Sequence, residues 1–138
     1  MVSTKYISIS SQGNCHVLDI TRKVQELVKE MPWQNGIITI FCPSATSALT
    51  TVEFESGCIK DIQDFFDEII NPNKNYAHNL RWCDGNGHSH LRAALLQPDL
   101  TVPVVENQLT LGTWQQIVFI DFDTRPRARK LVVQGVGE

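Results

Sequence analysis

With 138 residues, of which 42% are apolar and 20% charged, the chain is sized for one globular domain with its own hydrophobic core. Its formal charge of −3 argues against general nucleic-acid binding, which usually needs a basic balance. No apolar stretch approaches the roughly 18 residues that cross a bilayer, and the first residues do not resemble a secretory signal. We therefore expect one domain, residues 1–138, in the cytoplasm, with neither a nucleic-acid nor a membrane partner.

The first half of the chain predicts short strands and two longer helices. Apolar residues from Asp19 to Met31 fall on one helical face, with Asp19 as the expected N-cap and Pro32 as the stop. A second helix with a strong apolar stripe is expected from Ser56 to the residues before Pro72. Alternating or β-branched residues predict strands at 5–10, 16–19, 36–42 and 48–53.

The second half predicts a glycine-rich loop, one short helix and then only strands. The short helix is expected from about Ser89 to Leu96, before Pro98. Turns are expected at 106–107 and 124–126, and strands at 100–105, 108–111, 114–122 and 129–136. Without a regular βαβ alternation, the pattern predicts an α+β fold, in which mixed or antiparallel sheets pack with two longer helices and one short helix.

The four cysteines are widely spaced and form no C-x-x-C pair. This usage is typical of buried thiols in a reducing compartment rather than of a disulfide framework. Cys83 lies near a group of histidines, so a role as a metal ligand is an alternative to a structural role for this residue.

Three of the four histidines, His78, His88 and His90, surround the turn Asp84-Gly85-Asn86-Gly87. Imidazole is the commonest metal ligand near neutral pH, and a turn brings side chains together. His88 and His90 face the same way in an extended segment but point about 200° apart on a helix. Binding of one ion by both therefore requires that they lie before or at the start of the helix, where the glycines loosen the backbone.

A divalent metal, zinc before Mg²⁺, is the first hypothesis for this histidine cluster, because three nitrogen ligands with an open position are typical of catalytic zinc. Two alternatives stay open. The histidines would act without metal, as a general acid or base or as binders of an anion. Or they would be structural, with His88 capping the helix and the other two in solvent.

Other candidate groups lie outside the histidine cluster. Arg125, Arg127 and Arg129 alternate, so on an extended segment their guanidiniums project to one side and suit a phosphate; a solvated hairpin end is the alternative. Glu53 is a candidate base or metal ligand, or part of a solvent-facing edge. Trp114 beside Gln115 is either core or the wall of a binding pocket.

The motifs together resemble the YjbQ-like protein family, over about residues 5–138. The resemblance is carried by Gly-Ile-Ile-Thr-Ile-Phe, Ser-Ala-Thr-Ser-Ala-Leu-Thr-Thr-Val-Glu, Tyr-Ala-His, Asp-Gly-Asn-Gly-His-Ser-His-Leu-Arg-Ala, Leu-Thr-Val-Pro-Val, Leu-Gly-Thr-Trp-Gln-Gln and Arg-Lys-Leu-Val-Val-Gln. Members of this family have been linked to a secondary thiamine-phosphate synthase activity. The resemblance implies a compact α+β domain that forms trimers and has a pocket near the histidines that holds a metal ion.

The resemblance implies a role for each candidate residue. Matched positions are His78 and His90 as metal ligands, Glu53, Trp114 and Gln115 as the catalytic group, and Arg129 as a residue that binds a phosphorylated substrate. The expected site adds His88 to the metal ligands, and Ser44, Thr46, Arg125 and Arg127 to the residues that bind the substrate. One departure affects the metal. Ser44 stands where many members have a histidine, and His88 is the expected replacement.

The resemblance therefore implies a homotrimeric, metal-binding enzyme that acts on a small phosphorylated molecule, with thiamine-phosphate synthesis as the expected reaction. Two other functions remain open. One is an oligomer that binds a small anion or a metal without turnover, and the other is a small zinc-dependent phosphoester hydrolase.

Overall fold

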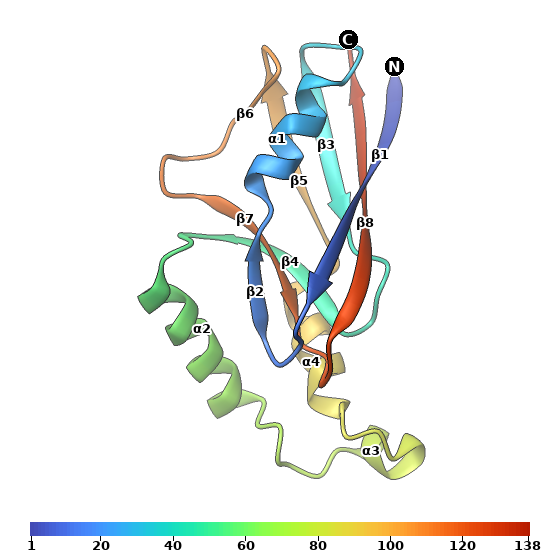
Figure 1. The fold of residues 1–138 in the computed structure, drawn as a ribbon, viewed down its shortest axis with the longest axis vertical. Coiled ribbons are helices and arrows are strands. Elements are labelled where there is room, and N and C mark those ends of the chain that lie inside the picture. Colours follow the sequence, from blue (N-terminus) through green and yellow to red (C-terminus); the bar gives the residue numbers. More distant parts are fainter.

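The computed structural model describes residues 1–138 and contains two antiparallel sheets and four helices, as Figure 1 shows. The strands are β1 (Val2–Ser11), β2 (His16–Asp19), β3 (Gly36–Phe41), β4 (Ser47–Val52), β5 (Asp99–Val105), β6 (Gln108–Leu109), β7 (Gln116–Asp121) and β8 (Arg127–Gly137). The helices are α1 (Thr21–Lys29), α2 (Ser56–Ile69), α3 (Ala77–Trp82) and α4 (Gly87–Leu96). The expected α+β class is confirmed.

The two sheets form a layered core. One face of the five-stranded sheet, ordered β1-β8-β3-β5-β6, packs on α1 and on the three-stranded sheet β2-β7-β4. Side chains such as Ile38 and Val133 are fully buried between these layers. The other face of the three-stranded sheet is covered by α2 and α4, which contribute Phe66 and Ala93 to a second apolar cluster. None of the helices combines the length and apolar character needed to cross a bilayer.

The central strand β7 is buried on both faces and carries a continuous apolar run, Ile117–Ile120. Ile117 and Phe119 belong to the core against the five-stranded sheet, whereas Val118 and Ile120 belong to the core under the helices. Since side chains alternate along a strand, Asp121 continues the row of Ile117 and Phe119. The interior between the two sheets therefore becomes polar at the end of β7.

Several boundaries differ from the sequence-based expectation for local reasons. The first helix begins at Thr21, and Asp19 is not its N-cap. The Asp19 carboxylate instead accepts hydrogen bonds from the backbone N–H and the hydroxyl of Thr21, at 2.9 and 2.7 Å, which holds a turn just before the helix. β7 begins at Gln116 rather than at residue 114, because the Gln115 side chain accepts from the Gly112 N–H and closes a loop.

The histidine segment also differs from the prediction. His78, expected in a loop, lies in the short helix α3, and α4 begins at Gly87 rather than near Ser89. His88 and His90 are therefore both inside α4. Residues that are two positions apart on a helix point to different sides, so the side chains of His88 and His90 diverge.

Candidate functional site

His78 on α3 and His90 on α4 form a close pair. Their ring centroids lie 4.2 Å apart, with the planes tilted by 42°. Nδ1 of His78 lies 3.4 Å from Oδ1 of Asp84, a residue of the short connection between the two helices. The structure thus brings together two of the three predicted histidines and adds a carboxylate that the sequence did not single out.

His88 points away from this pair. It is 5% exposed, its ring centroid lies 6.5 Å from that of Tyr76, and its Nδ1 has no hydrogen-bond partner. Nowhere in the chain do three histidine, cysteine or carboxylate side chains lie close enough to hold one metal ion. One chain therefore supplies two imidazoles to the candidate site rather than three.

The two glycines of the turn have different roles. Gly85 has a φ of +67°, which a side chain would disfavour, and nothing lies within 4 Å of a Cβ built there. Gly87 instead permits a close approach, since its Cβ would lie 2.6 Å from Cβ of Tyr76. Its N–H also donates to Oδ1 of Asn79 at 2.8 Å. This contact fixes α3 against the start of α4 and so sets the position of His78.

The surroundings of His90 favour its neutral form. Burial lowers the pKa of His90 below its ordinary value of 6.5 and the neighbouring His78 lowers it further, while Asp84 and Asp123 oppose both. A neutral imidazole near pH 7 has a free lone pair, so His90 is suited to accept a proton or to bind a metal ion.

A buried polar cluster lies beside the histidine pair, at the end of β7. Asp121 is fully buried and accepts two hydrogen bonds from Arg129, from Nε at 2.8 Å and from Nη2 at 3.0 Å. The Ser11 hydroxyl donates to the same carboxylate at 2.6 Å. The Arg129 guanidinium therefore has a carboxylate partner within the chain, which limits what it has left for an external anion.

Asp123 extends this cluster towards the histidines. It accepts from Nε of Arg127 at 2.8 Å and from the Thr46 hydroxyl at 3.3 Å, and Thr46 in turn accepts from Nη2 of Arg129 at 2.9 Å. The side-chain amide of Asn86, just before α4, lies between the two carboxylates. Its NH2 group donates either to Oδ1 of Asp123 at 3.4 Å or, with the amide turned over, to Oδ1 of Asp84 at 2.9 Å. The histidine pair and the arginines thus belong to one continuous polar region.

The three arginines do not act as one group. Arg127 and Arg129 project to the same side of β8, as their alternation predicts, and pair there with buried carboxylates. Arg125 precedes the strand, is exposed and has no ion pair. A pocket of about 220 Å³ opens beside them and is lined in part by Ser44, Ser47, Arg129 and Lys130. The two hydroxyls and the Arg129 guanidinium, which Asp121 already pairs, are the polar groups that this pocket offers to a small anion.

The predicted residues Glu53, Trp114 and Gln115 lie far from this region, at the other end of β7. Gln115 donates to the Thr51 hydroxyl at 3.1 Å, whereas Trp114 is 72% exposed. β7 extends five residue steps from Gln116 to Asp121, which separates its ends by about 17 Å. The predicted site residues therefore form two separate groups. We call the region of His78 and His90 the histidine end, and the region of Glu53, Trp114 and Gln115 the tryptophan end.

The sequence analysis missed Asp121 and Asp123, although a signal was present. The two carboxylates alternate at the end of an apolar run, and the paired arginines alternate in the next strand. Charges that alternate in step with buried residues on adjacent strands indicate partners inside the protein rather than a solvated hairpin.

Comparison with known proteins covers nearly the whole chain. The sequence model of a family described as "UPF0047 protein YjbQ-like" matches residues 5–138. A UPF0047 protein of Archaeoglobus fulgidus is 33% identical over 130 residues, covering 94% of this chain and 98% of the relative. One from Methanothermobacter thermautotrophicus is 34% identical over 137 residues, covering 99% of this chain and 94% of the relative.

Solved structures show the same fold. A protein of Sulfolobus solfataricus, described as YbjQ-like and of unknown function, superposes with a TM-score of 0.90 at 31% identity and covers 100% of both chains. A hypothetical protein of Aeropyrum pernix superposes with a TM-score of 0.91 at 32% identity and covers 99% of both chains.

Proposed function

The chain belongs to the YjbQ-like family, and from this membership and the geometry of the histidine end we propose that it is an enzyme acting on a small phosphorylated molecule. The observation that carries the proposal is the His78–His90 pair, at 4.2 Å between ring centroids, within one polar region that also holds Arg127 and Arg129. Paired imidazoles beside cationic groups suit proton transfer next to a bound anion.

The anionic part of the substrate is assigned to the pocket beside Ser44. Arg129 is the cationic side chain on the inner face of β8 at this pocket. Lys130 points to the other face of the strand, where its ammonium lies 4.3 Å from the centroid of the Tyr6 ring. The Ser44 and Ser47 hydroxyls, which hydrogen-bond to each other, add donors at the same pocket. Thr46 lies deeper, between Asp123 and Arg129, and positions the arginine rather than the ligand.

A divalent metal ion, zinc before Mg²⁺, is part of the same proposal, because nitrogen ligands favour zinc. The residues of one chain match it only in part. His78 and His90 supply two imidazoles, whereas zinc sites use three or four protein ligands, and His88 faces away from the pair. We therefore derive no step through the metal. The proposed reaction transfers no proton to a base, so the neutral ring of His90 is assigned to hydrogen-bond the substrate.

The reaction proposed first is thiamine-phosphate synthesis, which rests on the family resemblance. The bond between the pyrimidine methylene carbon and pyrophosphate breaks, and a carbon–nitrogen bond forms to the thiazole phosphate, so that pyrophosphate leaves with the electron pair. Cationic groups near the leaving group would stabilise the negative charge that develops on it. A homotrimer is the proposed assembly. The cytoplasm is the proposed location, since four free thiols suit a reducing compartment.

Zinc content and turnover of purified protein test the proposal, with His90→Gln and His88→Phe as a matched pair. We expect His90→Gln to lose at least tenfold in thiamine-phosphate formation and to bind less zinc, while His88→Phe keeps both, because His88 does not face the pair. Equal losses in the two variants would contradict this assignment. Stoichiometric zinc without turnover indicates a binding protein, and phosphate release from simple phosphoesters indicates a hydrolase.

A further inference from the structure

The pocket beside Ser44 adjoins a buried group of charges that cancel one another. Asp121, at the end of β7, pairs with Arg129 of β8 at 2.8 Å. Asp123 follows it in the chain and pairs with Arg127 at 2.7 Å. The two carboxylates are 0% and 2% exposed, and the two guanidiniums balance their charge. A ligand in the pocket therefore meets an arginine whose charge is already neutralised inside the protein.

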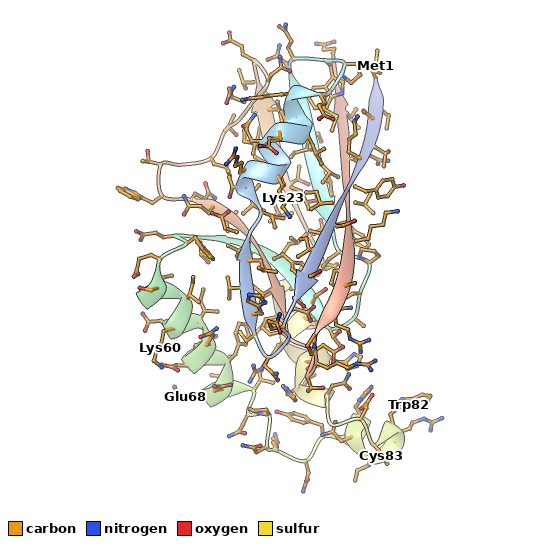
Figure 2. The ribbon with its side chains drawn as sticks, in the orientation of Figure 1. Met1, Lys23, Lys60, Glu68, Trp82 and Cys83 are labelled. Atoms are coloured by element: carbon orange, nitrogen blue, oxygen red, sulfur yellow. The ribbon has the colours of Figure 1, made fainter.

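Charged side chains elsewhere contribute little to the electrostatic potential in this pocket. Lys60 and Glu68 are exposed, and Figure 2 shows both on α2, outside the sheets. Lys130, the neighbour of Arg129, points to the outer face of β8. Salt screens exposed charges beyond about 10 Å, whereas buried charges are screened much less. The balanced group of four buried charges therefore dominates the potential that a bound anion meets.

The rest of the pocket wall is apolar or uncharged. Pro43, Ala128 and Leu131 line it together with Cys42. Burial raises the pKa of the Cys42 thiol, so this group stays neutral near pH 7. Transfer of an ion from water to such surroundings costs free energy that grows with the square of the charge. A dianion therefore costs about four times as much to desolvate as a monoanion of the same size.

Few hydrogen-bond donors remain to offset this desolvation cost. Nε and Nη2 of Arg129 donate to Asp121 and Thr46, so Nη1 is the guanidinium nitrogen left without a partner in the chain. The Ser44 and Ser47 hydroxyls hydrogen-bond to each other, which leaves one hydroxyl hydrogen for a ligand. Ser44 Oγ also accepts from the Thr46 N–H at 3.3 Å. These donors suit one negative charge better than two.

We propose that this pocket selects a singly charged anionic group and binds a phosphate monoester in its singly protonated form. The serine oxygens accept the hydrogen bond of the P–OH group, and Nη1 of Arg129 donates to a charged oxygen. The pocket then suits the phosphate monoester of the thiazole rather than pyrophosphate, which carries more negative charge. This inference deepens the proposed function and rests on it, because that function assigns the pocket to the substrate.

Two probes of similar shape test the selection in the wild-type protein. Methyl sulfate carries one negative charge at pH 5 and at pH 8, whereas methyl phosphate gains its second charge near pH 6. At pH 8 and fixed ionic strength, we expect methyl sulfate to bind at least tenfold more tightly than methyl phosphate. At pH 5, methyl phosphate should bind at least as tightly as methyl sulfate. Because both probes are compared at one pH, protonation of the protein affects both.

Nuclear magnetic resonance measures both affinities and locates the probes, through the shifts of the Arg129 Nε–H and of the Ser44 and Ser47 amides. Asp121→Asn removes one balancing charge and keeps the shape of the side chain. At pH 8 it should bring the affinity for methyl phosphate to at least that for methyl sulfate. If this variant does not fold, Asp123→Asn makes the same change in net charge, and the comparison of probes in the wild type decides by itself.

Two further variants locate the site. Ser44→Ala should weaken the binding of both probes, because it removes a hydroxyl from the pocket. Lys130→Gln, which removes a cation from the opposite face of β8, should weaken neither. Equal effects of these two substitutions place the anion elsewhere and overturn the proposal. It is also overturned if methyl phosphate binds the wild type at pH 8 as tightly as methyl sulfate, or if neither probe binds at 100 mM.

Turnover separates this inference from the proposed function. A preference for the singly charged probe without thiamine-phosphate formation rejects the proposed reaction and leaves the selectivity of the pocket standing. Thiamine-phosphate formation by a protein that prefers the doubly charged probe rejects the selectivity alone.

Discussion

Asp121 and Arg129 form a two-point ion pair at the junction between the apolar core and the candidate site. Nε and Nη2 of Arg129 donate to the two carboxylate oxygens at 2.8 and 3.0 Å, and Asp121 is fully buried. The guanidinium is therefore held by a partner of its own chain before any ligand arrives. Arg129 presents a positioned charge at the wall of the pocket, and Asp121 is the residue that positions it.

Removal of Arg129 should strongly destabilise the fold. Arg129→Ala leaves the Asp121 carboxylate buried without its partner, and we expect a loss of about 3–5 kcal/mol in the free energy of unfolding. The exposed Arg125 has no ion pair, so Arg125→Ala should change stability by less than about 0.5 kcal/mol. Urea unfolding measures both variants. Similar midpoints for the two would show that the ion pair contributes little.

A methyl group at Gly87 should separate His78 from His90. The added Cβ would lie 2.6 Å from Cβ of Tyr76, and we expect a loss of about 1–3 kcal/mol in stability as α3 is displaced. Gly85→Ala is the matched control, because it strains only the backbone, by about 1–2 kcal/mol. Nuclear Overhauser contacts between the rings should disappear in Gly87→Ala and persist in Gly85→Ala. Persistence in both would contradict the packing role of Gly87.

The sequence predicted the fold well wherever one face of an element is buried. The strand expected at 114–122 and the helix expected from Ser56 are both present, because burial imposes a regular period on the apolar side chains of such elements. Boundaries were less predictable. The Asp19 carboxylate accepts hydrogen bonds from Thr21 in a turn instead of capping the helix. The sequence does not distinguish the turn from the cap, because both use the same residues.

The pairing within the histidine cluster could not be predicted from spacing. Whether His88 or His90 joins His78 depends on where α4 begins, and α4 begins at Gly87, where the backbone packs closely against Tyr76. This contact joins the segment before α3 to the start of α4, and the spacing of residues in the sequence does not predict it. For the arginines, the alternation predicted that the side chains project to the same side of the strand. The carboxylates that pair with Arg127 and Arg129 are seen only in the structure.

Two of the four thiols should be unreactive in the folded protein. Burial raises the pKa of Cys15 to about 11, with a smaller opposing effect from Arg92, and burial also raises the pKa of Cys42. We expect both to resist a disulfide reagent at pH 8 until urea unfolds the chain, whereas the less buried Cys58 reacts without urea. A single fast phase for all thiols would contradict this burial.

The Asp123–Arg127 pair should make the free energy of unfolding depend on pH in the acid range. Burial alone would raise the pKa of Asp123, but the Thr124 N–H and Arg127 outweigh it and hold the pKa below the ordinary 3.8. The unfolded chain therefore binds more protons in this range, and the stabilisation is present above pH 3.8 and lost as pH falls towards the folded pKa.

Arg127→Gln tests the origin of that dependence. Without the guanidinium, burial is opposed by fewer groups and the pKa of Asp123 rises in the folded chain. The difference in proton binding between the folded and unfolded chains then shrinks, so Arg127→Gln should be less stable than the wild type at neutral pH and should lose less stability as pH falls below 3.8. Arg125→Gln, at an exposed and unpaired position, should leave the profile unchanged. Urea midpoints between pH 2 and 7 give the comparison. If Arg127→Gln and the wild type lose the same amount of stability as pH falls below 3.8, Arg127 does not hold the Asp123 carboxylate in its charged form.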